Sequence, residues 1–173
     1  WQTSVDDGSG MSGCSGYDVN GDGRFEILYA DETAFYLFDG ATGEVLYENT
    51  AHASATHIEY PVVADVDADG SAEILFVSNF DTHGGGDHGL TVLGHAGNGW
   101  ARSGPAWPSF DFAVTNLNQD ATVPVTTPHY WLDHNVYRSR PTVDDFGVDL
   151  EAEIVDVCYA GCEGAQVSVR IAN

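Results

Sequence analysis

Short runs of hydrophobic residues, separated by glycine and acidic residues, recur along the first half of the chain. They are rich in β-branched and aromatic residues and lack the spacing of three to four residues that an amphipathic helix requires. Glycines at residues 39–43 suit a hairpin turn between two of the runs. The pattern predicts an all-β sandwich, barrel or propeller, with strands at residues 25–30, 34–38, 44–47, 60–64, 73–77 and 89–93.

An internal repeat narrows these choices. Residues 18–28 (DVNGDGRFEIL) and 65–75 (DVDADGSAEIL) are identical at seven of eleven positions. A degraded third copy begins at Asn116. A period of about 50 residues with several strands in each unit is typical of a propeller blade, which must pack against neighbouring blades to bury both faces of its sheet.

The last part of the chain has a different pattern. Residues 141–147 have the composition of a linker, and residues 148–157 and 165–171 alternate apolar with polar or charged side chains, as half-buried strands do. Two strands alone do not make a stable domain. We therefore expect residues 1–140 to form blades of about three repeats, 141–147 a linker, and 148–173 part of a β-sandwich.

Side chains that carry oxygen ligands occupy positions one, three, five and nine of the first repeat loop. In a tight turn, such residues can point their oxygens at one cation, and Ca²⁺ takes about six to eight oxygen ligands. Gly23, sixth in the loop, permits the sharp turn, and the residue after it would contribute its backbone carbonyl. The sequence predicts a calcium site whose ligands are Asp18, Asn20, Asp22, Arg24 through its carbonyl, and Glu26.

The second loop repeats the pattern and predicts a second calcium site. Its ligands would be Asp65, Asp67, Asp69, Ser71 through its carbonyl, and Glu73. Neither loop is an EF-hand, because position twelve holds an aromatic residue and an apolar strand follows. The alternative is a turn rich in Asp and Asn whose side chains bond only to their own backbone.

Ligand charge ranks the two sites. The first loop carries three carboxylates and the second carries four, and more ligand charge generally gives tighter calcium binding. We expect the second site to be the tighter one. In the third copy, Ala121 replaces the loop glycine and Pro124 replaces the closing acid, so we expect that copy to keep its turn and to have lost the metal.

The net charge limits the classes of partner. Five Lys and Arg against 27 Asp and Glu give a net charge of −22, which repels nucleic acid and anionic membranes. No run of about 18 apolar residues is present. We expect no nucleic-acid partner and no membrane insertion. Part of the acidity is explained equally well as a means of keeping an extracellular protein soluble.

Three cysteines bear on the cellular compartment. Cys158 and Cys162 are close enough to pair across a tight turn, which would leave Cys14 without a partner in this chain. An oxidising compartment fits this pattern, so we expect a secreted or cell-surface protein. No Cys-x-x-Cys motif is present, which argues against zinc-ribbon and thioredoxin-like sites. Because the chain begins at Trp1, we also expect it to be part of a longer protein.

The loop pattern Asp-x-Asx-x-Asp-Gly-x-x-Glu-Ile resembles the FG-GAP/VCBS repeat, the blade unit of integrin-α-like β-propellers, over residues 14–130. Residues 39–44, 59–64 and 131–140 are similar to stretches of large bacterial surface proteins, and the C-terminal strands resemble the opening of an Ig-like, CARDB-type adhesion module. The resemblance implies four-stranded blades, calcium in the inter-strand loops, and a role in adhesion or surface architecture.

Such propellers have about seven blades, whereas this chain has room for about three. Unclosed blades expose strand edges, which favour strand addition from a neighbour. Self-assembly is therefore a second hypothesis, and other copies, surface proteins and glycans are candidate partners besides calcium.

Tryptophans and histidines in the sequence suggest two alternative functions. Trp100, Trp107 and Trp131 suggest a carbohydrate-binding module, and His83 with His88 suggest a transition-metal site. More often, tryptophans of this kind fill the interfaces between blades. The glycine-rich segment that contains the two histidines, residues 83–88, is more often a mobile loop. No nucleophile motif or phosphate loop is present, so we expect no enzyme. A fragment of a propeller-type polysaccharide lyase is the enzymatic alternative.

Overall fold

The structure is a computed structural model that describes residues 1–79, 86–118, 120, 122–127, 129–133, 137–140, 142, 151–158 and 166–172. It divides into two compact units, Trp1–Val143 and Asp144–Asn173. Strands and loops make up nearly all of the described residues, and the single helical turn among them is α1 (Tyr130–Asp133). Within this described part, no helix has the length and apolar character that a membrane span needs.

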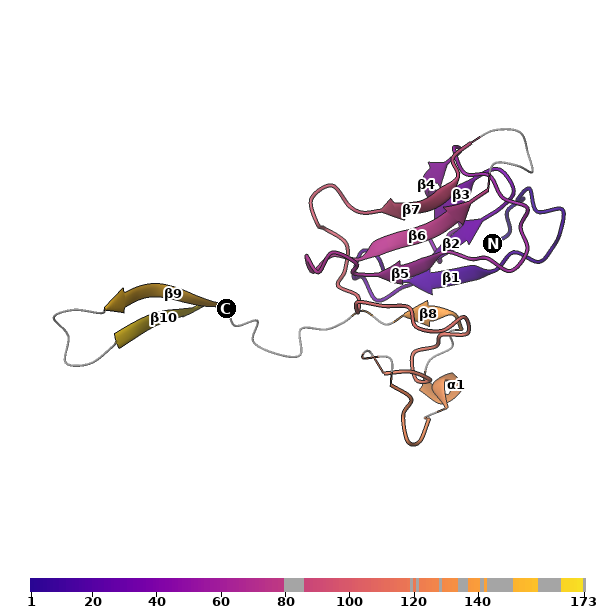
Figure 1. Ribbon diagram of the computed structural model, residues 1–173. Helices are drawn as coiled ribbons and strands as arrows, with labels where there is room; N and C mark the ends of the chain where they lie inside the picture. Colours follow the sequence, from indigo (N-terminus) through magenta and orange to yellow (C-terminus); the bar gives the residue numbers. More distant parts are fainter. Residues whose placement is uncertain are drawn as a thin grey trace. The chain divides into compact units, whose positions relative to one another are not determined.

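The first sheet of unit 1 is an antiparallel meander of four strands with a fifth strand added at its edge (Figure 1). The strand order is β4-β3-β2-β1-β8, and β8 pairs parallel with β1. The strands are β1 (Cys14–Tyr17), β2 (Glu26–Ala30), β3 (Phe35–Phe38), β4 (Val45–Asn49) and β8 (Ser139–Arg140). The first repeat therefore forms the four-stranded unit expected of a blade.

The second sheet has three antiparallel strands in the order β5-β6-β7. They are β5 (Val62–Ala64), β6 (Glu73–Ser78) and β7 (Gly89–Leu93). All six strands predicted for this part of the chain are confirmed, with ends shifted by no more than two residues. The hairpin predicted between β3 and β4 is also confirmed, because the two strands pair antiparallel.

The two sheets share one core. The Phe35 ring on β3 stacks on the Phe76 ring on β6, with centroids 4.3 Å apart and planes 4° apart. Such a pair adds about 0.5–1.5 kcal/mol to the stabilisation from burial alone. The other buried core residues come from both repeats: Tyr17, Val19, Leu28, Ala30, Leu37, Val63, Ala72 and Ile74. The repeats are thus packed against each other, as blades must be to bury their sheets.

Residues 100–104, here called the bridging segment, cross the start of both repeat loops. The Ala101 amide donates to the Val19 carbonyl at 2.8 Å in the first loop, and the Asp65 amide of the second loop donates to the Gly104 carbonyl at 3.1 Å. The Tyr17 hydroxyl donates to the same segment, 2.8 Å from the Ala101 carbonyl oxygen. Both repeat loops are therefore hydrogen-bonded to one common stretch of backbone.

The third repeat differs from the blade that its sequence suggests. The described residues between 94 and 127 contain no strand. The expected turn is present, because the Asn118 amide donates to the Thr122 carbonyl at 2.9 Å. Pro124 cannot donate to a sheet ladder, and no apolar run like that of β2 or β6 follows it. The segment therefore packs as loop rather than as a third sheet.

Unit 2 contains one antiparallel hairpin of β9 (Glu151–Cys158) and β10 (Gln166–Ala172), with an irregularity between Ser168 and Val169. The two strands predicted here are confirmed, but one hairpin does not test the predicted Ig-like module. Cys162 lies outside the described residues, as do residues 141–147 apart from Thr142. The Cys158–Cys162 disulfide and the linker therefore stay predictions.

Candidate metal centres

The first repeat loop connects β1 to β2 and is held by backbone amides that converge on Asp18. The Gly23 amide donates to Asp18 Oδ2 at 2.7 Å, and the Asp22 amide donates to Asp18 Oδ1 at 3.0 Å. Gly23 has a φ of 86°, in the left-handed region that glycine adopts at least cost. The turn predicted at the sixth loop position is confirmed.

Glu26, the closing acid of this loop, is the first residue of β2 and is only 1% exposed. It accepts from the Val19 amide at 2.8 Å and from the Asn20 side-chain amide at 3.3 Å. Burial raises the pKa of the Glu26 carboxyl, and the negative charges of Asp18 and Asp22 raise it further. A bound cation would relieve this repulsion, but the oxygens of Asp18, Asp22 and Glu26, all described residues, do not all lie within 4.8 Å of one another as those of the second loop do.

The second loop connects β5 to β6 with the same hydrogen-bond scheme. The Gly70 amide donates to Asp65 Oδ2 at 3.2 Å, and the Val66 amide donates to Glu73 Oε2 at 2.9 Å. Gly70 has a φ of 87°, nearly equal to that of its counterpart in the first loop. Two loops 47 residues apart in sequence have thus folded alike.

Three carboxylates of the second loop form a compact group. One oxygen each from Asp65, Asp67 and Glu73 lies within 4.8 Å of the other two. Oxygens on opposite sides of Ca²⁺ are up to about 5 Å apart, given calcium–oxygen distances of about 2.3–2.6 Å. Asp65 Oδ1 is buried and has no hydrogen-bond partner among the described residues. A buried carboxylate oxygen without a donor is costly, so these residues fit a divalent cation.

The two loops differ in how their closing acid is compensated. Asn20 of the first loop donates its side-chain amide to Glu26, whereas the equivalent Asp67 has no proton to donate. Burial raises the pKa of the Glu73 carboxyl, and the charge of Asp67 is the largest of the neighbouring charges that raise it further. The closing acid of the second loop therefore lacks the side-chain donor that the closing acid of the first loop has.

The Asx-turn alternative is also visible in the structure. Asp22 accepts from the Arg24 amide at 2.9 Å, and Asp69 accepts from the Ser71 amide at 2.8 Å. Asp69, a predicted ligand, is exposed and does not belong to the three-carboxylate group. Each Asp has a second oxygen, so these turns are compatible with cation binding. The carbonyl ligands assigned to Arg24 and Ser71 stay predictions.

Two features of the second loop were not foreseen from its sequence. Ala68 has a φ of 62° at the position where the first loop has Gly21, whose φ is 73°. A left-handed non-glycine residue costs about 1 kcal/mol or more. Arg102 of the bridging segment lies beside the turn, because a Cβ on Gly70 would be 3.3 Å from Arg102 Nη2. A positive charge is therefore already close to this acidic loop.

The other candidate residues separate into three groups. Trp100 and Trp107 pack against the core cluster, as blade-filling aromatics do. Trp131 is 61% exposed. The histidine pair is untested, because His83 lies outside the described residues.

The comparisons with known proteins agree with this local geometry. Residues 18–76, which include both loops, match the family described as FG-GAP-like repeat. This segment is similar to FG-GAP-like repeats. The matched segment runs from the first loop into β6, so the likeness covers both loops and the strands between them. The comparison with curated protein sequences gave no match.

A solved structure extends the likeness beyond the FG-GAP-like segment. The crystal structure of the V. cholerae biofilm matrix protein Bap1 is 32% identical and superposes with a TM-score of 0.67. The alignment covers 75% of this chain but 22% of that protein. The chain thus spans about a fifth of the length of the structure it matches, and the all-β fold of its repeats is shared with a bacterial matrix protein.

Proposed function

We propose that this chain is a calcium-stabilised structural module of an extracellular adhesion or matrix protein, with one Ca²⁺ in each FG-GAP-like loop. The observation that carries the proposal is the group formed by Asp65, Asp67 and Glu73, whose oxygens lie within 4.8 Å of one another. The buried, unpartnered Asp65 Oδ1 supports it. In the first loop, Asp18, Asp22 and Glu26 occupy the equivalent or neighbouring loop positions, but among the described residues their oxygens do not form such a group.

Calcium would act here on the stability of the fold. Each loop joins two neighbouring strands of a sheet, and both loops contact the bridging segment. A cation that neutralises the clustered acids binds the folded chain and not the unfolded one, so its binding free energy adds to the free energy of unfolding. The proposed role is therefore architectural.

Two findings support an extracellular setting. The repeat family matches, and the structural neighbour is a biofilm matrix protein. Extracellular calcium modules bind with Kd values of about 10⁻⁴–10⁻³ M, which a site with several carboxylates reaches readily.

We propose a non-catalytic role, because the best-placed acids belong to the loops. Self-assembly through the edge strands β4 and β7 is a further hypothesis, which the net charge of −22 would oppose without a cation.

Thermal unfolding with and without calcium tests this proposal. We expect excess EDTA to lower the Tm by about 10 °C relative to saturating Ca²⁺, because binding at about 100 times the Kd contributes about 2.7 kcal/mol. A variant with Asp18→Asn and Asp65→Asn should lose this response. An equal Tm under both conditions would contradict the proposal, and Mg²⁺ at the same concentration controls for ionic strength.

A further inference from the structure

A second candidate site lies away from the metal loops, in the segment that follows the second repeat. It is a pocket of about 490 Å³, within the range of about 300–1,000 Å³ that is common for small-molecule sites. Its lining includes Asp111, Asn116, His129, Trp131 and Tyr137. The pocket therefore combines aromatic surface with a carboxylate and an amide.

The aromatic side of this pocket is a flat platform. The Trp131 ring on α1 stacks on the His129 ring, with centroids 4.5 Å apart and planes 10° apart, and Tyr130 meets it edge-on. His129 thus covers one face of the indole, while the side chain of Trp131 stays 61% exposed. An aromatic cage for a cation needs several ring faces turned inward. This arrangement instead offers one flat face, which suits a flat ligand.

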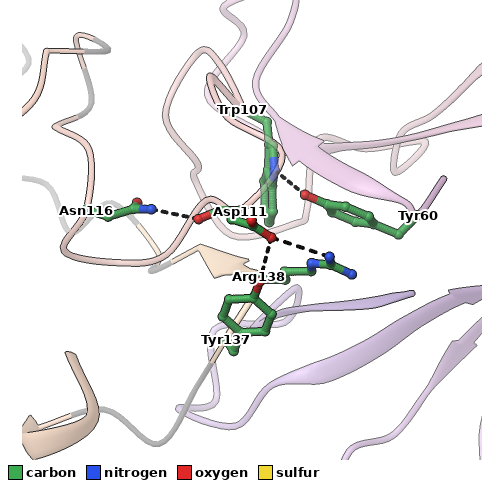
Figure 2. A network of polar contacts seen from close by, with 6 residues as sticks. All are labelled: Tyr60, Trp107, Asp111, Asn116, Tyr137 and Arg138. Atoms are coloured by element: carbon green, nitrogen blue, oxygen red, sulfur yellow. Dashed lines mark hydrogen bonds and ion pairs between the residues drawn. The ribbon is translucent and has the colours of Figure 1, made fainter. Parts of the chain in front are cut away.

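The polar side of the pocket is built around Asp111 (Figure 2). Asp111 Oδ1 accepts from the Tyr137 hydroxyl and lies 3.4 Å from Arg138 Nη2. The Tyr137 hydrogen bond lowers the pKa of the Asp111 carboxyl, and Arg138 lowers it further, so the group is ionised at neutral pH. The Asn116 side-chain amide donates to the Asp111 carbonyl at 2.6 Å. These contacts hold the carboxylate in place.

Arg138 is itself fixed by rings on its other side. Its guanidinium lies 4.6 Å from the ring centroids of both Tyr60 and Phe110, and the Tyr60 hydroxyl accepts from the Trp107 indole at 3.2 Å (Figure 2). The positive charge of Arg138 is therefore already balanced by contacts with two ring faces and one carboxylate. The pocket therefore keeps a net negative character and does not favour an anionic ligand.

We propose that this pocket binds a neutral sugar residue of an extracellular polysaccharide. The C–H face of a pyranose ring would stack on the open face of Trp131, and ring hydroxyls would donate to the Asp111 carboxylate. An acidic sugar would be repelled by Asp111 and by the net charge of −22. This site shares no residue with the calcium loops, so each of the two proposals can fail without the other.

Titration of the whole chain with short oligosaccharides tests the proposal. The probes are cellotriose, maltotriose and mannotriose as neutral sugars, and trigalacturonate as an acidic one, followed by tryptophan fluorescence and calorimetry. We expect at least one neutral trisaccharide to bind at millimolar concentration and trigalacturonate to bind more weakly. Trp131→Ala should lower the affinity about tenfold, and Trp131→Phe should keep part of it.

Leu132→Ala is the matched control, because Leu132 lies on the same helical turn and is 72% exposed. It should leave the affinity unchanged. Asp111→Asn should weaken the binding of the neutral sugars, while Asp67→Asn in the calcium loop should not. The proposal is overturned if no neutral trisaccharide binds, if trigalacturonate binds more tightly, or if Trp131→Ala binds as the wild type does with an unchanged Tm.

Discussion

At the third position of the loop, the first repeat has Asn20 and the second has Asp67. The amide of Asn20 donates to Glu26, whereas Asp67 brings another carboxylate oxygen within 4.8 Å of Asp65 and Glu73. One residue therefore separates a loop whose closing acid has a side-chain donor from a loop whose closing acid lies beside another carboxylate. The predicted order of calcium affinities depends on this difference.

Reciprocal substitutions test that order. Asp67→Asn gives the second loop the ligand types of the first and should weaken its calcium affinity about tenfold, since ligand charge largely sets the affinity of such sites. Asn20→Asp should tighten the first loop. Calorimetric calcium titration of both variants measures the changes, with Asp120→Asn in the third loop, which we expect to have lost the metal, as control. Unchanged affinities, or changes in the reverse order, would refute the ranking.

His52 is a buried titratable residue outside the two repeat loops. Its Nε2 lies 3.0 Å from the Asp31 carbonyl oxygen and its Nδ1 lies 2.8 Å from Ser78 Oγ. A neutral ring with the proton on Nε2 satisfies both contacts. Burial lowers the pKa of His52 below its usual 6.5, although the carboxylates of Asp31 and Glu59 act in the opposite direction. The fold therefore favours the neutral imidazole.

This shift predicts how the stability depends on pH. Between the lowered pKa and about 6.5, the unfolded chain binds more protons than the folded one, so the free energy of unfolding decreases as the pH falls through this window. Urea unfolding between about pH 7.5 and 5 with saturating Ca²⁺ measures this slope. His52→Gln should flatten the slope, and the exposed His57→Gln should not. Equal slopes in wild type and His52→Gln would count against this account.

At the scale of elements, the strands with a hydrophobic run were predictable and the strands without one were not. β1 reads Cys-Ser-Gly-Tyr and was missed, because its stabilising contacts are remote in sequence. Ser15 bonds to the Pro61 carbonyl and Tyr17 bonds to the Ala101 carbonyl, 46 and 84 residues away. β8, with two residues, is likewise defined only by its pairing with β1.

The two faces of β6 give a prediction at this scale. Phe76 is buried against Phe35, whereas the next residue, Val77, points to the other face and is 49% exposed. Phe76→Ala should lower the free energy of unfolding by about 3–5 kcal/mol through lost contacts and a cavity. Val77→Ala should cost less than about 1 kcal/mol. Chemical denaturation measures both values, and similar costs for the two variants would contradict the packing of the sheets.

For the whole molecule, the conformation of the two repeat loops was predictable because their pattern is local and occurs twice. Every candidate ligand lies within nine residues of the first one in its loop. Trp131 was a candidate for carbohydrate binding from the sequence, but the pocket that joins it to Asp111 was not predictable, because its residues carry no shared motif. Sequence also gave no sign of the bridging segment, whose contacts to both loops depend on the packing of two sheets.

These contacts make the loops a junction between the two repeats. The Val19 carbonyl and the Asp65 amide both bond to the bridging segment, so calcium in either loop would restrain backbone that serves both sheets. Loss of the cation should therefore loosen unit 1 as a whole rather than one hairpin.

Calcium titration of the chelator-treated chain by calorimetry is the most direct measurement of the central claim, that the two acidic loops each hold one Ca²⁺. The account predicts two bound Ca²⁺ per chain, with the tighter site lost in Asp65→Asn and the weaker one lost in Asp18→Asn. Absence of calcium binding at millimolar concentration, or a stoichiometry that neither substitution reduces, would contradict it.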